Sequence, residues 1–177
     1  NGIMEKNNEG YNQVVSTLYA AVLKAGIKQE SITRTRNKTA AEYIEPGLDA
    51  VVQGKKIDFK FKNTLPNKLI IFANVMDNKL MVYIVGKKQD NVKNDLKVEV
   101  EQKYEPPIIN VENQDLMPGE KRLVSPGKEG VKVSVYMTTI KDNGQTVKKF
   151  IYSDKYEAIE AVVQIGPNTK WDGRNIK

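Results

Sequence analysis

The spacing of hydrophobic residues changes once along the chain, close to residue 26. Between Gly10 and Gly26 apolar residues recur every three or four positions, which predicts a single amphipathic helix. Gly26 stands where a left-handed C-terminal cap is expected. The predicted apolar stripe consists of Val14, Leu18, Val22 and Ala25, with Val15 and Tyr19 beside it. Because an isolated amphipathic helix cannot hide such a stripe, we expect the first sheet of the protein to cover it.

After the helix, apolar and polar residues mostly alternate, and this period of two predicts strands. Residues 57–63 (IDFKFKN) place Ile and Phe side chains on one face and charged side chains on the other, as a half-buried strand does. Residues 69–75 are almost continuously apolar, which is typical of a central strand covered on both faces. Residues 76–79 form a turn, and residues 80–85 return as the second strand of a hairpin. The first half is therefore predicted to be an α+β domain, with one helix packed on antiparallel strands.

A polar stretch at residues 87–95 has little to bury, so we place a domain boundary there, between residues 1–94 and 95–177. Beyond it, strand patterns recur and no helical segment is found. Asp142-Asn143-Gly144 is a strong hairpin signal, and Asp154-Lys155 is taken as a further turn.

The stretch from Pro106 to Gly130 is rich in Pro and Gly and has little to form a compact core. Pro106-Pro107 cannot both donate to a sheet ladder, so the chain must leave the sheet or run along its edge. The second half is thus predicted to be an elongated all-β domain of small sheets, arranged as a meander and ending in a short tail.

The composition is that of a globular protein, with 40% hydrophobic and 28% charged residues. The net charge of +6 lies in the first half, because residues 1–94 hold 15 Lys and Arg against 9 Asp and Glu, whereas residues 95–177 hold 13 of each class. Such a field favours an anionic partner. The basic residues are scattered without an aromatic platform, so a nucleic-acid partner is not predicted. No apolar run has the length of a membrane span, and we expect membrane attachment only through an anchor outside this chain.

The chain contains no Cys and no His, which excludes thiol nucleophiles, imidazole bases and most zinc sites. We therefore expect no metal and no cofactor. Asp49 and Asp58 form a candidate pair of carboxylates for a hydrolase. A turn cap or an exposed strand face explains both without catalysis, and we favour that interpretation. The aromatic residues that could stack on sugars are Tyr136, Tyr152, Tyr156 and Trp171, although strand aromatics more often serve sheet packing.

Three segments in order, QVVSTLYAAVLKAG, YIEPGLDAVV and IDFKFKN, resemble the C-terminal part of a VanW-like domain, up to about residue 87. This is a Gram-positive family linked to glycopeptide-resistance clusters and surface proteins. Residues 95 to 167 resemble a G5 (G-five) domain, a surface module named for its glycines. The matching segments are PGEKRLVSPGKEGVKVSVY and EAVVQIGPN, and the glycines that follow its pattern are Gly119, Gly127, Gly130, Gly144 and Gly166. We expect these glycines to serve close strand approach and bulges rather than ligand contact.

The VanW-like resemblance has two departures. The family usually has a glycine triplet followed by Cys at the start of this helix, where the chain has Asn8, Glu9, Gly10, Tyr11 and Asn12. It usually has a His after the helix, where Asn37 aligns best. Asn12 offers no nucleophile and can at most cap the helix. The resemblance also implies that the chain begins inside the family's domain, so that further strands precede it.

Together, the residues and the resemblance predict a non-enzymatic extracellular module, attached to the cell wall or anchored to the membrane as in a lipoprotein. The favoured partner is peptidoglycan or a glycan containing N-acetylglucosamine. The candidate ligand-binding residues are Asn12, Arg34, Arg36, Asn37, Asp49, Tyr152, Tyr156 and Trp171. Asn12 is expected to face Asn37 across a cleft, with an arginine nearby to favour an anion. The alternatives are a peptidoglycan-modifying enzyme with a degenerate site around Asn12, Asn37 and Asp49, and a purely mechanical surface stalk. The oligomeric state is not indicated.

Overall fold

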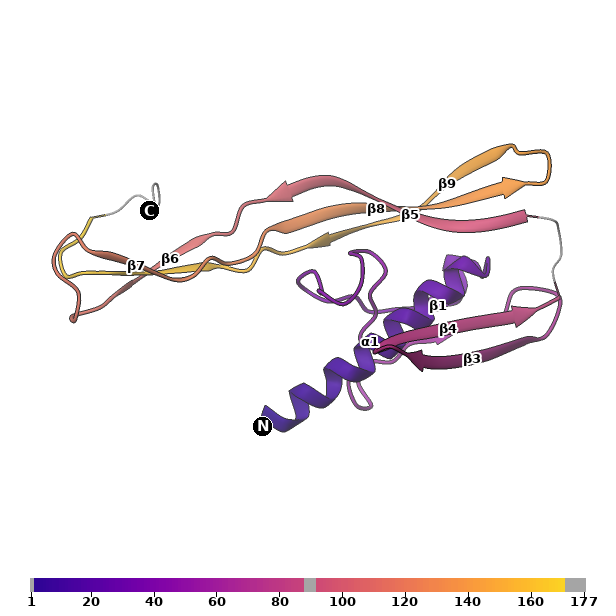
Figure 1. Cartoon of the computed structure of the whole chain (residues 1–177), viewed down its shortest axis with the longest axis horizontal. Helices are drawn as coiled ribbons and strands as arrows, with labels where there is room; N and C mark the ends of the chain where they lie inside the picture. Colours follow the sequence, from indigo (N-terminus) through magenta and orange to yellow (C-terminus); the bar gives the residue numbers. More distant parts are fainter. Residues whose placement is uncertain (1, 88–91, 171–177) are drawn as a thin grey trace.

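The computed structural model describes residues 2–87 and 92–170 and shows an elongated molecule whose helix lies beneath one half of a long β structure (Figure 1). The elements are α1 Gly2–Lys24, the short 3-10 helix η1 Gln29–Ser31, β1 Ile32–Thr33, β2 Lys60–Phe61, β3 Leu69–Met76, β4 Lys79–Gly86, β5 Val92–Tyr104, β6 Ile108–Glu112, β7 Lys121–Ser125, β8 Gly130–Lys141, β9 Thr146–Tyr156 and β10 Ala161–Ile165. The strands form four small sheets, β1–β2, β3–β4, β5–β8–β9 and β6–β10–β7. We call β5–β8–β9 the near sheet, because it lies over α1, and β6–β10–β7 the distal sheet (Figure 1). The predicted α+β region followed by an elongated all-β region is confirmed.

The predicted helix is present as α1, but it begins at Gly2 instead of Gly10. Its buried apolar residues are Val15, Tyr19, Val22 and Leu23, whereas Val14 is 51% exposed. The predicted stripe was therefore wrong at Val14. The reason is that the inner face also carries polar residues, such as the fully buried Ser16, which a hydrophobic pattern does not count.

Sheets from both halves of the chain cover α1. The helix packs on β4 on one side and on β5 of the near sheet on the other. Val135 of β8 belongs to the same buried cluster as Tyr19 of α1 and Leu48, and Leu96 and Val98 of β5 pack against that cluster. The expectation that the first sheet alone covers the helix was therefore wrong. The division at residues 94 and 95 remains a prediction, and the hydrophobic core draws on both sides of it.

The hairpin predicted at residues 69–85 is present as β3–β4, with a tight turn at Asp77 and Asn78. However, β3 is an edge strand with most of its residues exposed, so the prediction of a central strand covered on both faces was wrong. The strand predicted at 57–63 shrinks to β2, which pairs with β1 over two residues on each strand. Phe59, just outside β2, packs against the core.

In the second half, β5, β8 and β9 are antiparallel neighbours, and the hairpin signal at Asp142-Asn143-Gly144 marks the turn between β8 and β9. No turn occurs at Asp154-Lys155, because β9 continues to Tyr156. In the distal sheet, β10 pairs in parallel with β6 and antiparallel with β7, so the second half is not a simple meander.

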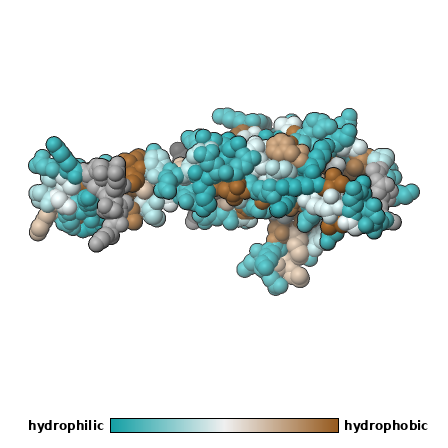
Figure 2. Space-filling view, turned by 90° about the horizontal axis from the view of Figure 1, so that it is seen from above, coloured by the Kyte–Doolittle hydropathy of each residue, from teal (hydrophilic) through white to brown (hydrophobic). Residues whose placement is uncertain are grey.

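Two glycines of the predicted pattern allow close backbone approach in and beside the distal sheet. A Cβ atom at Gly166 would overlap the carbonyl oxygen of Met117, and one at Gly127, which has a φ of 68°, would overlap the carbonyl oxygen of Ile159. Only glycine fits such positions without moving the neighbouring backbone. The surface seen from above is mainly hydrophilic, with small apolar patches (Figure 2).

Candidate functional site

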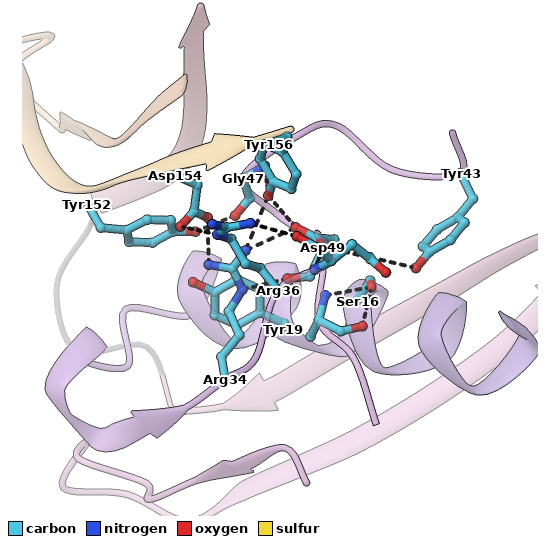
Figure 3. Close-up of polar contacts among 12 residues, drawn as sticks. Ser16, Tyr19, Arg34, Arg36, Tyr43, Gly47, Asp49, Tyr152, Asp154 and Tyr156 are labelled. Atoms are coloured by element: carbon cyan, nitrogen blue, oxygen red, sulfur yellow. Dashed lines mark hydrogen bonds and ion pairs between the residues drawn. The ribbon is translucent and has the colours of Figure 1, made fainter. Parts of the chain in front are cut away.

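The buried carboxylate of Asp49 is the centre of a polar cluster that joins the two halves of the chain. Asp49 is 1% exposed, in the segment that follows the turn at Gly47. One carboxylate oxygen, Oδ1, accepts a hydrogen bond from Arg34 Nη2 at 3.0 Å and another from the Tyr156 hydroxyl. The other, Oδ2, accepts from the backbone N–H and the side-chain amide of Asn37, each at 2.6 Å (Figure 3). Both oxygens are therefore fully used within the protein, which holds the group in place.

Arg34 joins two carboxylates that come from different halves of the chain. Its side chain is 7% exposed and lies 2.8 Å from Asp154 on β9 in addition to its contact with Asp49. The guanidinium carbon lies 4.8 Å from the ring centre of Tyr19 and 5.3 Å from that of Tyr152. Burial by itself would lower the pKa of Arg34, but the surrounding phenols and Asp154 outweigh it and raise the pKa. The guanidinium is thus a buried cation held by carboxylates and aromatic faces.

Arg36 is more exposed and plays a lesser part. Its Nε lies 3.8 Å from Asp154, its guanidinium lies 5.3 Å from the ring centre of Tyr156, and it donates a hydrogen bond to the carbonyl oxygen of Asn37. With two arginines and two aspartates, the cluster is close to neutral. It offers no surplus positive charge to an anion, contrary to what the position of these arginines in the sequence suggested.

Alternation along β9 places Tyr152, Asp154 and Tyr156 on one face, towards α1 and the turn at Gly47 (Figure 3). The Tyr156 hydroxyl accepts a hydrogen bond from the Gly47 N–H at 2.7 Å, and the Tyr152 hydroxyl donates one to the Gly47 carbonyl at 2.6 Å. Burial raises the pKa of both phenols, helped at Tyr156 by the negative charge of Asp49. Both hydroxyls therefore stay protonated at neutral pH and act as donors.

These positions correct the prediction of sugar-stacking tyrosines. Tyr156 is fully buried, and Tyr152 is half-buried with its ring against Tyr19 and Arg34. Neither presents a free aromatic face to solvent, because the near sheet packs on the first half of the chain. Trp171 lies outside the described residues.

Polar residues of α1 hold the segment after Gly47 by its backbone. Ser16 Oγ donates to the carbonyl oxygen of Ala50 at 3.1 Å and accepts from its N–H at 2.8 Å. Asn12 Oδ1 accepts from the N–H of Val52 at 2.9 Å. Asn12 and Ser16 are one helical turn apart, so they contact alternate residues of an extended segment. Asn12 is thus a positioning residue here and not the N-cap that the sequence suggested.

A groove of about 380 Å³ lies beside this cluster. Its lining residues are Glu9, Asn12, Asn37, Thr39, Ala40, Ala41, Glu42, Tyr43, Lys128 and Ile159. Asn12 and Asn37 therefore do share one cleft, whereas Arg34, Arg36 and Asp49 are not among its lining residues. The loop that forms one wall is tied to the second half of the chain. Lys128 Nζ donates to the carbonyl oxygen of Ala40 at 2.9 Å, and the N–H of Glu157 donates to that of Lys38 at 2.9 Å.

The groove has unused hydrogen-bonding capacity at its two asparagines. Asn12 uses its oxygen on Val52, and Asn37 uses its amide nitrogen on Asp49 and, at 3.4 Å, on the Tyr43 hydroxyl. Within the described residues, Asn12 Nδ2 and Asn37 Oδ1 make no hydrogen bond, which leaves one donor and one acceptor. No group of three acidic residues suited to a metal ion occurs in this part of the chain.

Five of the residues predicted from the sequence lie in or beside the cluster: Asn12, Arg34, Arg36, Asn37 and Asp49. Sequence reasoning missed Ser16, Gly47 and Asp154. The signal for Asp154 was available, since it stands midway between two tyrosines at strand spacing. For Gly47 the Pro46-Gly47 pair indicated a turn, whereas for Ser16 the sequence carries no comparable signal.

The structure thus has two parts. The first is an α+β region that contains most of the polar cluster, and the second is a β-rich region whose near sheet covers that cluster. Comparison with family models gives the parts their names. Residues 2–85 match the model described as VanW like protein, and residues 96–168 match the model of the G5 domain. The chain is therefore a VanW-like region followed by a G5 domain. This composition indicates a module of a cell-surface protein.

Two solved structures of G5 domains are similar to part of this chain. One is the G5 domain of an IgA1 protease, with 20% identity, a TM-score of 0.28, and coverage of 46% of this chain and 96% of that one. The other is HP0197-G5, with 22% identity, a TM-score of 0.27, and coverage of 45% and 100% respectively. No curated protein matches the chain. The one α-helix among the described residues, α1, is not long and apolar enough to cross a membrane.

Proposed function

We propose that this chain is a non-enzymatic module that binds the bacterial cell wall, through peptidoglycan or another glycan containing N-acetylglucosamine. The groove between the VanW-like region and the G5 domain is its binding site. The observation that carries this proposal is the unused amide pair of Asn12 and Asn37. An acetamido group has one N–H donor and one carbonyl acceptor. Its carbonyl oxygen can accept a hydrogen bond from Asn12 Nδ2 while its N–H donates one to Asn37 Oδ1.

The remaining lining residues suit the same ligand. The ring of Tyr43 supplies an aromatic surface for the C–H face of a sugar, and Thr39 supplies a hydroxyl beside it. Lys128 is paired with Glu42 at 3.2 Å, and Glu9 gives the groove a small net negative charge. A neutral glycan therefore fits this site better than an anionic wall polymer, which would instead engage the basic surface of the first half.

The enzyme alternative finds no support in the geometry of Asp49. A general base needs a free oxygen within reach of substrate. Both oxygens of Asp49 are occupied by protein donors, and the side chain is buried. Asn12 and Asn37 are committed to Val52 and Asp49 and offer no acid, base or nucleophile.

Retention of the intact chain on purified peptidoglycan tests the proposal, with soluble N-acetylglucosamine oligomers as competitor. Asn12→Asp keeps the oxygen that accepts from Val52 but removes the free donor. We expect it to weaken binding by about 3- to 10-fold, the contribution of one hydrogen bond. Tyr43→Phe should weaken binding by a similar or smaller factor. Salt should have little effect, because the contacts are neutral.

Asn143→Asp is the matched control, because Asn143 also uses its oxygen to accept from a backbone N–H, that of Gln145, and makes no hydrogen bond through its side-chain nitrogen within the described residues, but lies outside the groove. It should bind like the unmodified chain. Equal binding by Asn12→Asp and the unmodified chain would mean that the glycan binds elsewhere on the chain. Strong salt dependence would indicate an anionic polymer instead. If nothing is retained at any salt concentration, the chain is a mechanical spacer.

A further inference from the structure

The β3–β4 hairpin presents an apolar surface that nothing in the described chain covers. Its outward face carries side chains that are 45–67% exposed: Ile70, Phe72 and Met76 of β3, and Tyr83 and Val85 of β4. The Phe72 and Tyr83 rings lie 5.9 Å apart at their centres. Leu69–Met76 contains no charged residue and no proline, and its pairing with β4 runs without a bulge. Charged residues, prolines and bulges are the features by which proteins normally protect an edge strand. Their absence from β3 indicates a strand that can pair further.

The turn of the hairpin determines which backbone groups of β3 point to the free edge. Asp77 and Asn78 both have positive φ, 51° and 57°, as in a two-residue turn of type I′. In such a hairpin the flanking pair, Met76 and Lys79, is hydrogen-bonded, and the pattern then alternates along the strand. The even-numbered residues of β3 therefore bond to β4. The N–H and C=O groups of the odd-numbered residues, Leu69, Ile71, Ala73 and Val75, point outwards.

We propose that a second copy of this chain pairs antiparallel with β3, about a two-fold axis at Phe72. In this register Leu69 pairs with the partner's Val75, and Ile71 with the partner's Ala73. Every outward-pointing residue of β3 is then hydrogen-bonded, and the two hairpins form one four-stranded sheet. Phe72 lies opposite the partner's Phe72, so that Tyr83, Phe72 and their two counterparts make a continuous aromatic row across the sheet.

Charge selects the antiparallel arrangement over the parallel one. Along the free edge, Lys68 precedes β3 and Asp77 follows it, whereas Lys79 lies across the turn on β4, one strand away from that edge. Antiparallel pairing places Lys68 beside the partner's Asp77 at both ends of the pair. Parallel pairing would instead bring like charges together at each end. An arrangement in which each copy offers the same surface also closes on itself as a dimer.

Single-cysteine crosslinking tests this register directly, because the chain contains no Cys. Facing residues in a non-hydrogen-bonded antiparallel pair have Cα atoms about 4.5 Å apart, within the range that a disulfide spans. Phe72→Cys should therefore form a covalent dimer on mild oxidation. Tyr83→Cys lies on the same face but one strand away from the axis, and it should crosslink at least 10-fold more slowly.

Sedimentation of the chain over a range of concentrations provides the second measurement. The unmodified chain should show a monomer–dimer equilibrium. Ala73→Pro removes an N–H that points to the free edge but leaves the bonds to β4, and it should shift the chain to monomer. Ile71→Lys should do the same by placing a charge in the pair. A monomer at all concentrations, or equal crosslinking at positions 72 and 83, would overturn the proposal. A monomer that still binds an apolar dye at this hairpin would assign the surface to another occupant.

Discussion

The near and distal sheets have the same number of strands but are stabilised in different ways. In the near sheet, Val133 and Val135 are completely buried because α1 and the turn at Gly47 cover one face. In the distal sheet, every residue of β6 is exposed, and burial is concentrated in the central strand β10, at Ala161 and Val163. The near sheet therefore has a second layer, whereas the distal sheet depends mainly on backbone pairing.

This difference reflects how far apart in the sequence the packing partners of each sheet lie. The second layer of the near sheet comes from the first half of the chain, and the Asp49 cluster joins the two halves through charge and hydrogen bonds. The distal sheet is built from residues within 60 positions of one another, and close backbone approach at its glycines takes the place of packed side chains. A perturbation of the cluster should thus affect the whole molecule, and one of the distal sheet should stay local.

Replacing Arg34 should have the largest effect. Arg34→Met leaves Asp49 and Asp154 buried without their shared cation, and loss of one partner of a buried ion pair costs about 3–5 kcal/mol. We expect a fall of this size in the free energy of unfolding, measured by urea denaturation. Arg122→Met, on the exposed strand β7, is the matched control and should change it by less than about 0.5 kcal/mol. Equal losses in the two variants would mean that the cluster does not distinguish the two regions.

The second prediction concerns the distal sheet. Gly166→Ala forces a Cβ atom against the backbone of Met117, and overpacking of this kind costs about 1–3 kcal/mol. Hydrogen exchange should show lost protection in β6, β7 and β10 but retained protection in β8. Gly10→Ala is the control, since a Cβ there meets open space within a helix, and it should stabilise by about 0.5–1 kcal/mol. Lost protection in β8 would show that the distal sheet is not an independent unit.

Alkaline pH should sharpen the comparison further. Burial raises the pKa of Tyr19, Tyr152 and Tyr156 above the ordinary value of about 10. Above that pH the unfolded chain releases protons that the folded chain retains, so stability is complete below about pH 10 and falls as pH rises. Each buried phenol contributes a slope of about 1.4 kcal/mol per pH unit.

Tyr156→Phe should reduce this slope by the share of one phenol, measured by urea denaturation between pH 9 and 11. Tyr83→Phe, at an exposed position outside the cluster, is the matched control. Because the distal sheet contains no tyrosine, its hydrogen exchange should show no matching transition. An unchanged slope in Tyr156→Phe would mean that this phenol does not couple the two halves.

Local pattern was enough to predict the elements that depend on neighbouring residues. The helix after Gly10, the β3–β4 hairpin and the turn at Asp142-Asn143-Gly144 all follow from periodicity and turn chemistry. The failures share one physical cause. Val14 was assigned to the wrong face, and Tyr156 was expected at the surface, because burial in this fold is decided by segments far apart in the sequence. No periodicity within one segment indicates which distant segment will cover it.

The candidate site was predicted in part for a similar reason. The resemblance to the VanW-like family suggested that Asn12 and Asn37 share one cleft, and in the structure both line one groove. Their hydrogen bonds to Val52 and Asp49, and hence the atoms left free, depend on three-dimensional contacts. The groove itself needs Lys128 and Ile159 from the G5 domain, which a reading of either half alone cannot supply.

The hydrogen bond between Asp49 and Tyr156 also bears on how the chain is made. Its partners are 107 residues apart in the sequence. Ribosomes add about 5–20 residues per second, so about 5–20 s pass between the synthesis of the two residues. During that interval α1 and the segment after Gly47 exist without the strand that closes their core. The VanW-like region therefore cannot complete its fold first and wait for the G5 domain, and the two must mature together once β9 has been translated.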